Sequence, residues 1–122
     1  MKIRAWDVTD KCWIPEDCLA ITAKGELLTY EPDEDRWAID IICSMLCRSI
    51  DLRDKNGKEI FEGDIVKTVD SFGSRNGKVA FEPRMMSWYI EYIASAQFGG
   101  RNMFESAEII GNIYENSEFL TQ

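Results

Sequence analysis

The sequence contains no histidine among its 122 residues. Histidine is the most frequent general base in enzymes and the commonest protein ligand of metal ions. Carboxylates such as Asp64 and Glu82 could pair for acid–base or magnesium chemistry, but two such residues carry no signal in a chain with 22 acidic residues. We therefore expect no catalytic residues, no metal ion and no cofactor, and an enzyme is the least favoured class.

Long apolar runs and clusters of basic residues are missing as well. No apolar run reaches the roughly 20 residues that span a bilayer, and the segment after Met1 lacks the apolar core of a signal peptide. The 14 basic residues are outnumbered by 22 acidic ones, and the formal charge of −8 works against binding a phosphate backbone. We expect a cytoplasmic protein with no membrane partner, and nucleic acid is disfavoured as a partner.

Cysteine is present but lacks the spacing of a metal site. The four cysteines are Cys12, Cys18, Cys43 and Cys47, with spacings C-x5-C and C-x3-C. Zinc ribbons use C-x2-C pairs, so a four-cysteine metal site is an open but poorly supported alternative. In a reducing cytoplasm we expect free thiols that pack as small apolar core residues.

The stretch from Arg53 to Val69 contains two closely spaced turns followed by a strand. Asn56 and Gly57 tolerate the positive φ that a tight hairpin turn requires. A second reversal at Gly63 and Asp64 leads into a β-branched run that favours a half-buried strand. This pattern is typical of the entry to a small β-barrel, and it explains these residues by backbone geometry.

The remaining sequence is dominated by short alternating segments with turn residues between them. Strands are predicted over residues 3–7, 12–14, 18–22, 26–30, 78–82, 87–93 and 108–114. Loops are predicted over 31–36, 70–77 and 98–102. Residues 37–52 fit a strand or a helix, and their β-branched first half favours a strand.

Two features near the end of the chain carry more specific expectations. Gly111 interrupts its strand and suggests a bulge, with Asn112 beside it. Asn116 is placed to cap one helical turn over residues 117–120.

An aromatic stripe follows the chain through residues 87–93. We identify Trp88, Tyr89 and Tyr92 as a possible binding face, because small barrels often stack ligands on aromatic strand faces. Trp88 and Tyr92 share strand parity with Ile90, so packing into the core is the favoured alternative.

Several blocks of the sequence resemble one family of proteins. The blocks are IRAWD, RDKNGKEIFEGDIVK, GKVAFEPRMMSWYIEY and EIIGNIYENSEFL. They resemble the YopX-like proteins encoded by bacteriophages and prophages, which carry a T-G-L-x-D-K-N-G-K-E-I-Y-E-G-D-I-V block and close with V-I-G-N-I-Y-E-N-P-E-L-L. Here Ser49-Ile50-Asp51-Leu52 replaces the T-G-L segment, and Ser117 replaces the proline.

The resemblance implies a mainly β fold. We expect antiparallel hairpins around a small SH3-like β-barrel body with a short C-terminal helical turn. Residues 1–52 would form an N-terminal hairpin region and residues 53–122 the barrel-like region, within one compact unit. The recurrent residues Asn56, Gly57, Gly63, Asp64, Gly111 and Asn112 would be a structural motif.

The resemblance assigns no reaction or ligand. We therefore expect a non-catalytic phage accessory protein that binds a protein partner or itself as a homo-oligomer. The alternative is a small-barrel protein that binds nucleic acid.

Overall fold

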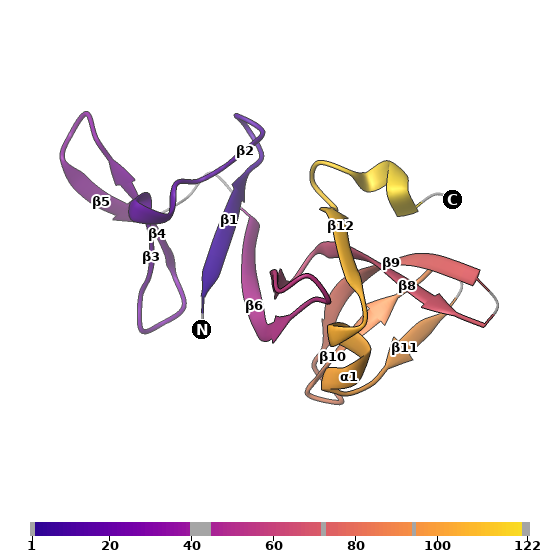
Figure 1. Ribbon diagram of the computed structural model, residues 1–122. Helices are drawn as coiled ribbons and strands as arrows, with labels where there is room; N and C mark the ends of the chain where they lie inside the picture. Colours follow the sequence, from indigo (N-terminus) through magenta and orange to yellow (C-terminus); the bar gives the residue numbers. More distant parts are fainter. Residues whose placement is uncertain (1, 40–44, 72, 94, 121–122) are drawn as a thin grey trace. The chain divides into compact units, whose positions relative to one another are not determined.

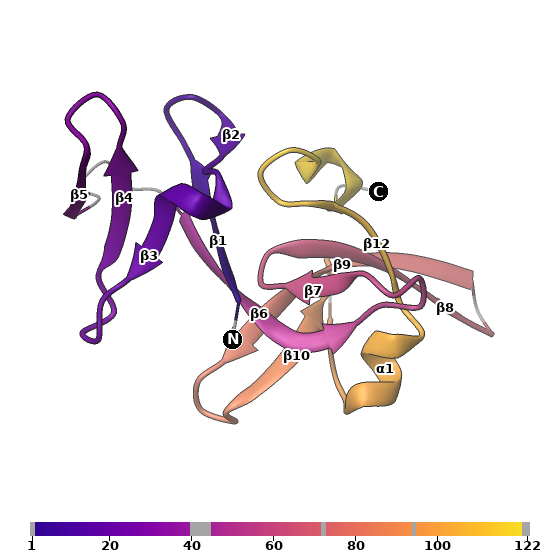
Figure 2. The ribbon, with the colours of Figure 1, turned by 60° about the vertical axis from the view of Figure 1, so that its left-hand side comes forward.

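The computed structural model describes residues 2–39, 45–71, 73–93 and 95–120. The chain forms two compact units (Figures 1 and 2). One comprises residues 3–47, and the other comprises residues 48–122 together with residues 1–2. The division between them lies inside strand β6 (Met45–Arg53), a few residues before the expected limit at residue 52.

The N-terminal unit is built from two antiparallel arrangements. Strands β1 (Ile3–Asp7) and β2 (Cys12–Trp13) form a hairpin in which Trp6 lies opposite Trp13. Their ring centroids are 5.1 Å apart at a steep angle, an edge-to-face geometry that favours contact between aromatic rings. The 3-10 turn η1 (Glu16–Cys18) then leads to the second arrangement.

The second arrangement is a three-stranded meander. Its strands are β3 (Leu19–Ile21), β4 (Leu27–Glu31) and β5 (Arg36–Ile39), in the order β3-β4-β5. Gly25 closes the first hairpin with φ +88°, a left-handed conformation that side chains disfavour. The hairpins predicted over residues 3–14 and 18–30 are therefore confirmed.

The C-terminal unit contains a five-stranded antiparallel sheet in the order β11-β10-β9-β8-β12. Its strands are β8 (Asp64–Asp70), β9 (Gly73–Glu82), β10 (Ser87–Glu91), β11 (Ala96–Phe98) and β12 (Glu108–Asn112). Strand β7 (Glu59–Phe61) pairs with β6, and this hairpin completes a half-barrel (Figure 2). The expected mainly β fold with antiparallel hairpins is thus confirmed.

A single apolar cluster fills the half-barrel. Its buried members come from β6 to β10, from the residue that follows β10, and from the segment around helix α1 (Arg101–Glu105): Ile50, Ile60, Val66, Val79, Ile90, Tyr92, Phe104 and Ala107. Leu52, Trp88, Met103 and Ile109 pack against this cluster. The cluster therefore packs the sheet against the β6–β7 hairpin.

Asp54 connects the β6–β7 turn to the last strand. Its carboxylate accepts hydrogen bonds from the backbone N–H groups of Asn56, Lys58 and Ile109, each 2.9 Å long. The side chain is 5% exposed, so the carboxylate depends on these donors in place of water. Burial alone would raise the pKa of Asp54, but the three donors and the Lys58 charge hold it below its ordinary value of 3.8.

The segment after β12 is held by two asparagines. The Asn112 Oδ1 accepts hydrogen bonds from the N–H groups of Tyr114 and Glu115 at 3.0 and 2.9 Å. The Asn116 Oδ1 accepts the Asn112 N–H at 3.2 Å, and the Asn116 backbone carbonyl accepts the Phe119 N–H at 3.0 Å. The turn itself is present as the 3-10 segment η2 (Ser117–Leu120).

Two local predictions are wrong. Residues 70–77 do not form a long loop, because β9 begins at Gly73 and Gly77 lies opposite Val66 within the sheet. A Cβ atom on Gly77 would lie 2.5 Å from Ile90 Cγ2, so this glycine serves close packing and not a turn. The loop predicted over residues 98–102 is reduced to Gly99 and Gly100, because β11 ends at Phe98 and α1 begins at Arg101.

The ambiguous segment 37–52 is strand wherever the structure describes it. Strand β5 covers residues 36–39, and β6 covers residues 45–53. Residues 40–44 lie outside the described part, and Cys43 with them.

Candidate functional site

The predicted aromatic face does not exist as one surface. Trp88 packs against the core cluster and Tyr92 belongs to it with 6% exposure, whereas Tyr89 points to the opposite side of β10. The Tyr92 hydroxyl is held 2.8 Å from Thr68 Oγ1 and 3.1 Å from Gln97 Oε1. Tyr89 stacks on Phe98 with ring centroids 4.9 Å apart. Alternation along the strand divides the three residues between two faces.

The residues of the expected structural motif lie in turns and at the end of β12. Gly57 and Gly63 have φ +82° and +87°, and Asn56 precedes Gly57 in the β6–β7 turn. Asp64 Oδ2 accepts the Phe61 N–H at 2.8 Å and closes the second turn.

Gly111 and Asn112 complete this set at the bulge in β12. The pairing of β12 with β8 shifts register between Ile109 and Gly111. A Cβ atom on Gly111 would lie 2.4 Å from Asn116 Oδ1, so only glycine permits this close approach. None of the six motif residues lines the surface described next.

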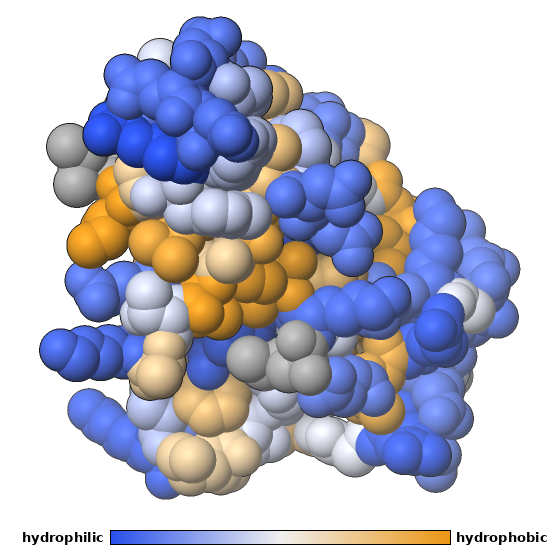
Figure 3. Space-filling model, turned by 90° about the vertical axis from the view of Figure 1, so that its left-hand side faces the viewer, coloured by the Kyte–Doolittle hydropathy of each residue, from blue (hydrophilic) through white to orange (hydrophobic). Residues whose placement is uncertain are grey.

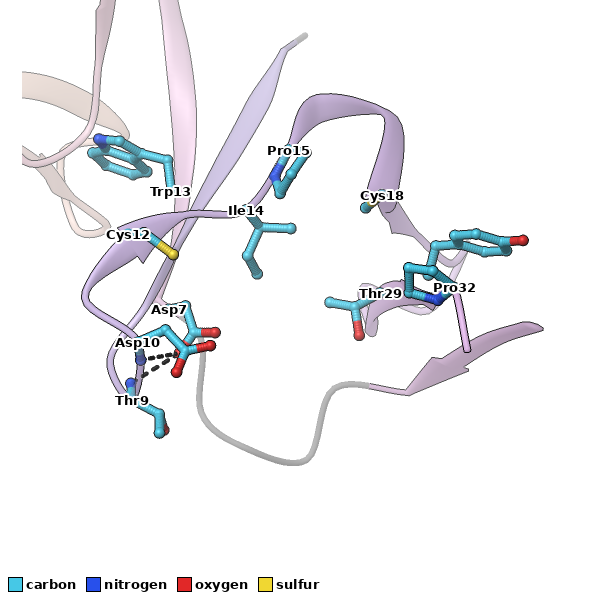
Figure 4. A pocket seen from close by; sticks show the side chains of 11 residues that line it. Asp7, Thr9, Asp10, Cys12, Trp13, Ile14, Pro15, Cys18, Thr29 and Pro32 are labelled. Atoms are coloured by element: carbon cyan, nitrogen blue, oxygen red, sulfur yellow. Dashed lines mark hydrogen bonds between the residues drawn. The ribbon is translucent and has the colours of Figure 1, made fainter. Parts of the chain in front are cut away.

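The N-terminal unit contains a groove of about 450 Å³ (Figure 4). Its lining comes from the β1–β2 hairpin with the η1 turn that follows, and from strand β4 with the start of the β4–β5 turn. The lining residues are Asp7, Thr9, Asp10, Cys12, Trp13, Ile14, Pro15, Cys18, Thr29, Tyr30 and Pro32. This volume lies in the range of small-molecule pockets.

The walls of the groove differ in chemistry. Figure 4 shows the carboxylates of Asp7 and Asp10 close together on one side, with Ile14 between them and Pro15. The Asp7 Oδ1 accepts hydrogen bonds from the N–H groups of Thr9 and Asp10, at 2.8 and 3.0 Å. These bonds fix the turn and hold the Asp7 carboxylate at the groove. The groove therefore combines an anionic wall with an apolar one.

The acidic residues of this unit fall into two groups. Arg36 Nε lies 3.1 Å from Glu31 and 2.9 Å from Glu34, which offsets the charge of the β4–β5 turn. Asp7 and Asp10 form no ion pair with any described residue. Negative charge is thus left uncompensated at the groove.

The charge of the whole chain is concentrated in the same unit. Residues 3–47 contain four basic and ten acidic residues, so they account for −6 of the formal charge of −8. The field at the groove attracts cationic partners and repels anionic ones.

An exposed apolar face lies on the meander of the N-terminal unit. Tyr30 lies opposite Trp37, and Leu28 lies opposite Ile39, so these four side chains share one face of the sheet. Trp37 and Ile39 are 46% and 53% exposed. We call these four residues the Trp37 face. Figure 3 views the side of the molecule that carries β3–β5 and shows apolar side chains gathered at its centre among hydrophilic ones.

Tyr30 joins the groove to the Trp37 face. It lines the groove, and its ring centroid lies 5.5 Å from that of Trp37. The Tyr30 hydroxyl donates a hydrogen bond to Asp35 Oδ1 across the β4–β5 turn. This bond to an anionic acceptor, with burial and the nearby Cys18, raises the pKa of Tyr30 above its ordinary value of 10.0. The two surfaces are therefore parts of one candidate site.

The described residues contain no cluster of three or more side chains suited to hold a metal ion. Cys12 and Cys18 are free thiols at the groove, and Cys12 is exposed, so only Cys47 among the three described cysteines is a buried residue as expected. No helix in the described part of the chain is both long and apolar enough to cross a membrane.

Comparison with known proteins identifies the family. A family model described as YopX protein matches residues 2–121. The chain belongs to the YopX family. The resemblance inferred from the sequence blocks is confirmed over residues 2–121. No curated protein matches the chain closely enough to count as a relative.

Two crystal structures share the fold. Protein yopX from Bacillus subtilis is 21% identical, with a TM-score of 0.64 over 97% of this chain and 96% of that one. A protein from Enterococcus faecalis is 24% identical, with a TM-score of 0.67 over 98% of this chain and 96% of the other. Similarity at this level of identity establishes the fold, and the activity has to be argued from the site.

The sequence contained partial signals of the candidate site. Asp7, Asp10 and the run around Glu31 are visible as acidic residues, but their unequal pairing with Arg36 depends on the fold. The exposure of Trp37 and Ile39 could not be read from residues 37–52, because a β-branched run looks the same whether both faces are buried or one is exposed.

Proposed function

We propose that this YopX protein is a non-catalytic phage or prophage accessory protein that acts by binding another protein through its N-terminal unit. The observation that carries the proposal is the Trp37 face, which exposes a tryptophan and an isoleucine beside a groove of about 450 Å³. Tryptophan is enriched among the residues that contribute most to protein–protein binding. Exposed apolar patches bordered by polar residues commonly mark such interfaces.

The proposed partner is a protein of opposite charge. The N-terminal unit carries −6, and complementary charge increases association rates and selects among partners. A second copy of the chain would bring two units of the same sign together. Binding to a different protein is therefore favoured over the homo-oligomer considered from the sequence.

In this proposal the C-terminal half-barrel is the scaffold, and we class it with the small SH3-like barrels. Five antiparallel strands around one apolar cluster support that assignment. The free thiols at the groove suit the bacterial cytoplasm, where they stay reduced.

Affinity capture with matched variants tests the proposal. The tagged chain is used as bait beside a Trp37→Ala/Ile39→Thr double variant and a Val69→Thr/Ile93→Thr control. Val69 and Ile93 are each 70% exposed and lie in the C-terminal unit, so the control lowers exposed apolar surface elsewhere. We expect a protein that is retained by the wild type and the control and is lost with the Trp37 variant.

Light scattering on the purified proteins separates the two kinds of partner. A wild type that is monomeric alone and forms a complex with the captured protein supports the proposal. A dimer that the Trp37 variant dissociates would assign the face to self-association. Equal capture by all three baits would refute the role of the Trp37 face.

One observation favours nucleic-acid binding as a second candidate. The stacked pair Tyr89 and Phe98 lies on the outer side of the sheet, with Phe98 41% exposed, and base stacking uses such rings. The opposing observation is the charge of the C-terminal unit, where ten basic residues face twelve acidic ones. A gel-shift assay with single- and double-stranded DNA at low salt tests this second function. The absence of a shift would rule out nucleic-acid binding.

A further inference from the structure

We infer that the groove receives a lysine or arginine side chain from a basic, partly apolar segment of the partner protein. This inference rests on the proposed function and specifies which chemistry the partner presents. It concerns the groove alone, whereas the proposed function is carried by the Trp37 face.

The first argument is that the groove has one apolar wall and one acidic wall. Ile14, Pro15 and Pro32 supply apolar surface, and the Asp7 and Asp10 carboxylates lie at one side of the groove (Figure 4). Lysine and arginine side chains also combine an apolar part with a polar one, since an aliphatic stem carries a cationic head. A side chain of this kind can cover the apolar wall with its stem and place its head at the carboxylates.

The second argument is electrostatic. An apolar occupant without charge would displace water from Asp7 and Asp10 and offer no replacement, which is costly for ionised carboxylates. Neither carboxylate has an ion-pair partner among the described residues, so an occupant that displaces their water is favoured if it brings a cation. The surplus of six acidic over basic residues in the unit adds to the attraction.

The third argument excludes two other occupants. A divalent metal ion requires a shell of several ligands, whereas the described residues, including the carboxylates and thiols that line the groove, form no group of three or more side chains suited to hold one. A second copy of the chain would approach with a net charge of −8. A basic segment of a different protein meets both the charge and the apolar lining.

Nuclear magnetic resonance with the full ¹⁵N-labelled chain tests the inference. The probe is a capped hexapeptide of alternating arginine and leucine, and its control replaces each arginine by citrulline, which keeps the shape and removes the charge. We expect the arginine peptide to shift the amide signals of Thr9, Ile14 and Thr29. We also expect binding to weaken as sodium chloride is raised, because the contact depends on charge.

Two variants carry the same loss of charge at different places. Asp10→Asn removes one charge at the groove, and its side chain makes no hydrogen bond with the described residues. Asp33→Asn removes one charge from the exposed β4–β5 turn, outside the groove. We expect at least a five-fold weaker dissociation constant with Asp10→Asn and a change below two-fold with Asp33→Asn. Thr29→Lys, which places a competing cation in the groove, should abolish peptide binding.

Each outcome bears on the inference. Equal affinity for the citrulline peptide, equal weakening by both aspartate variants, or shifts confined to the C-terminal unit would overturn it. Amide shifts that depend on protein concentration without peptide would assign the groove to a second copy and overturn it as well. Partner capture that depends on Trp37 while peptide binding fails would refute the inference and leave the proposed function standing.

Discussion

Replacing Asp54 with asparagine should destabilise the C-terminal unit by about 2–4 kcal/mol. The carboxylate accepts three backbone N–H bonds of 2.9 Å, and a hydrogen bond to a charged group contributes about 1.5–3 kcal/mol. An asparagine carbonyl can still accept the bonds from Asn56 and Lys58. Its NH2 group then faces the Ile109 N–H, so this donor loses its partner in a half-buried position.

Alanine at position 54 removes all three acceptor contacts, and we expect a larger loss of about 3–5 kcal/mol. A domain of this size is stable by roughly 5–15 kcal/mol in total, so the effect is easily measured. Urea denaturation at pH 7 gives the free energies of unfolding. Asp33→Asn, on an exposed turn, is the control and should change the free energy by less than about 0.5 kcal/mol.

The contribution of Asp54 should also depend on pH. Its pKa is below 3.8 in the folded chain, so the folded state favours the ionised form more than the unfolded state does. The stabilisation is complete above the unfolded pKa and is lost as the pH falls through the folded pKa. The difference in melting temperature between wild type and Asp54→Asn should therefore be constant from pH 7 to 5 and should narrow below pH 3.8. An Asp54→Asn variant as stable as wild type, or a difference that does not change with pH, would refute this account.

Three further predictions use single positions. Gly111→Ala would place a Cβ atom 2.4 Å from Asn116 Oδ1 and should cost about 2–4 kcal/mol in urea denaturation, whereas Gly100→Ala, with no atom within 4 Å, should cost less than about 1 kcal/mol. Asp51→Gly should raise the stability by about 0.5–1 kcal/mol, because Asp51 is exposed and has φ +61°; a lower melting temperature would contradict the idea that this conformation is strained. Tyr30 should ionise above pH 10.0 in an ultraviolet titration, and a normal midpoint would argue against its hydrogen bond to an anionic acceptor.

Much of the fold was predictable because local rules decide it. Gly25, Gly57 and Gly63 have positive φ at three hairpin or turn positions, and such turns set the register of the strands beside them. The bulge at Gly111 was predicted from an interrupted strand, and the β12–β8 register shows it.

The misplaced elements depend on contacts between distant residues. Gly77 follows Asn76, as in a turn, yet it lies within β9. A side chain at this position would collide with Ile90 and Tyr92, so the glycine is explained by close packing within the unit. Propensity identifies a residue that permits a turn, and tertiary packing decides whether a turn forms.

Asp51 shows how the family pattern and the structure explain each other. Counted back from Asp54, the glycine of the T-G-L pattern falls on Asp51, and the structure gives this position φ +61° at a register shift between β6 and β7. The pattern therefore reflects a backbone requirement. Aspartate meets it because its short polar side chain tolerates the left-handed region better than most others.

The candidate site was only partly predictable for a different reason. Whether an acidic residue is compensated depends on where Arg36 reaches, and whether Trp37 is covered depends on the other elements of the unit. Neither property has a signature in local sequence.

The bond from the Ile109 N–H to Asp54 has a consequence for the rate of folding. It joins residues 55 positions apart. The sheet is likewise incomplete until β12 pairs with β8. A contact between residues far apart in the sequence costs the entropy of closing the loop between them before it stabilises the chain. We therefore expect this unit to fold slowly for its size. The same late closure means that a chain interrupted before residue 108 would leave an open sheet edge along β8, available for pairing with other chains.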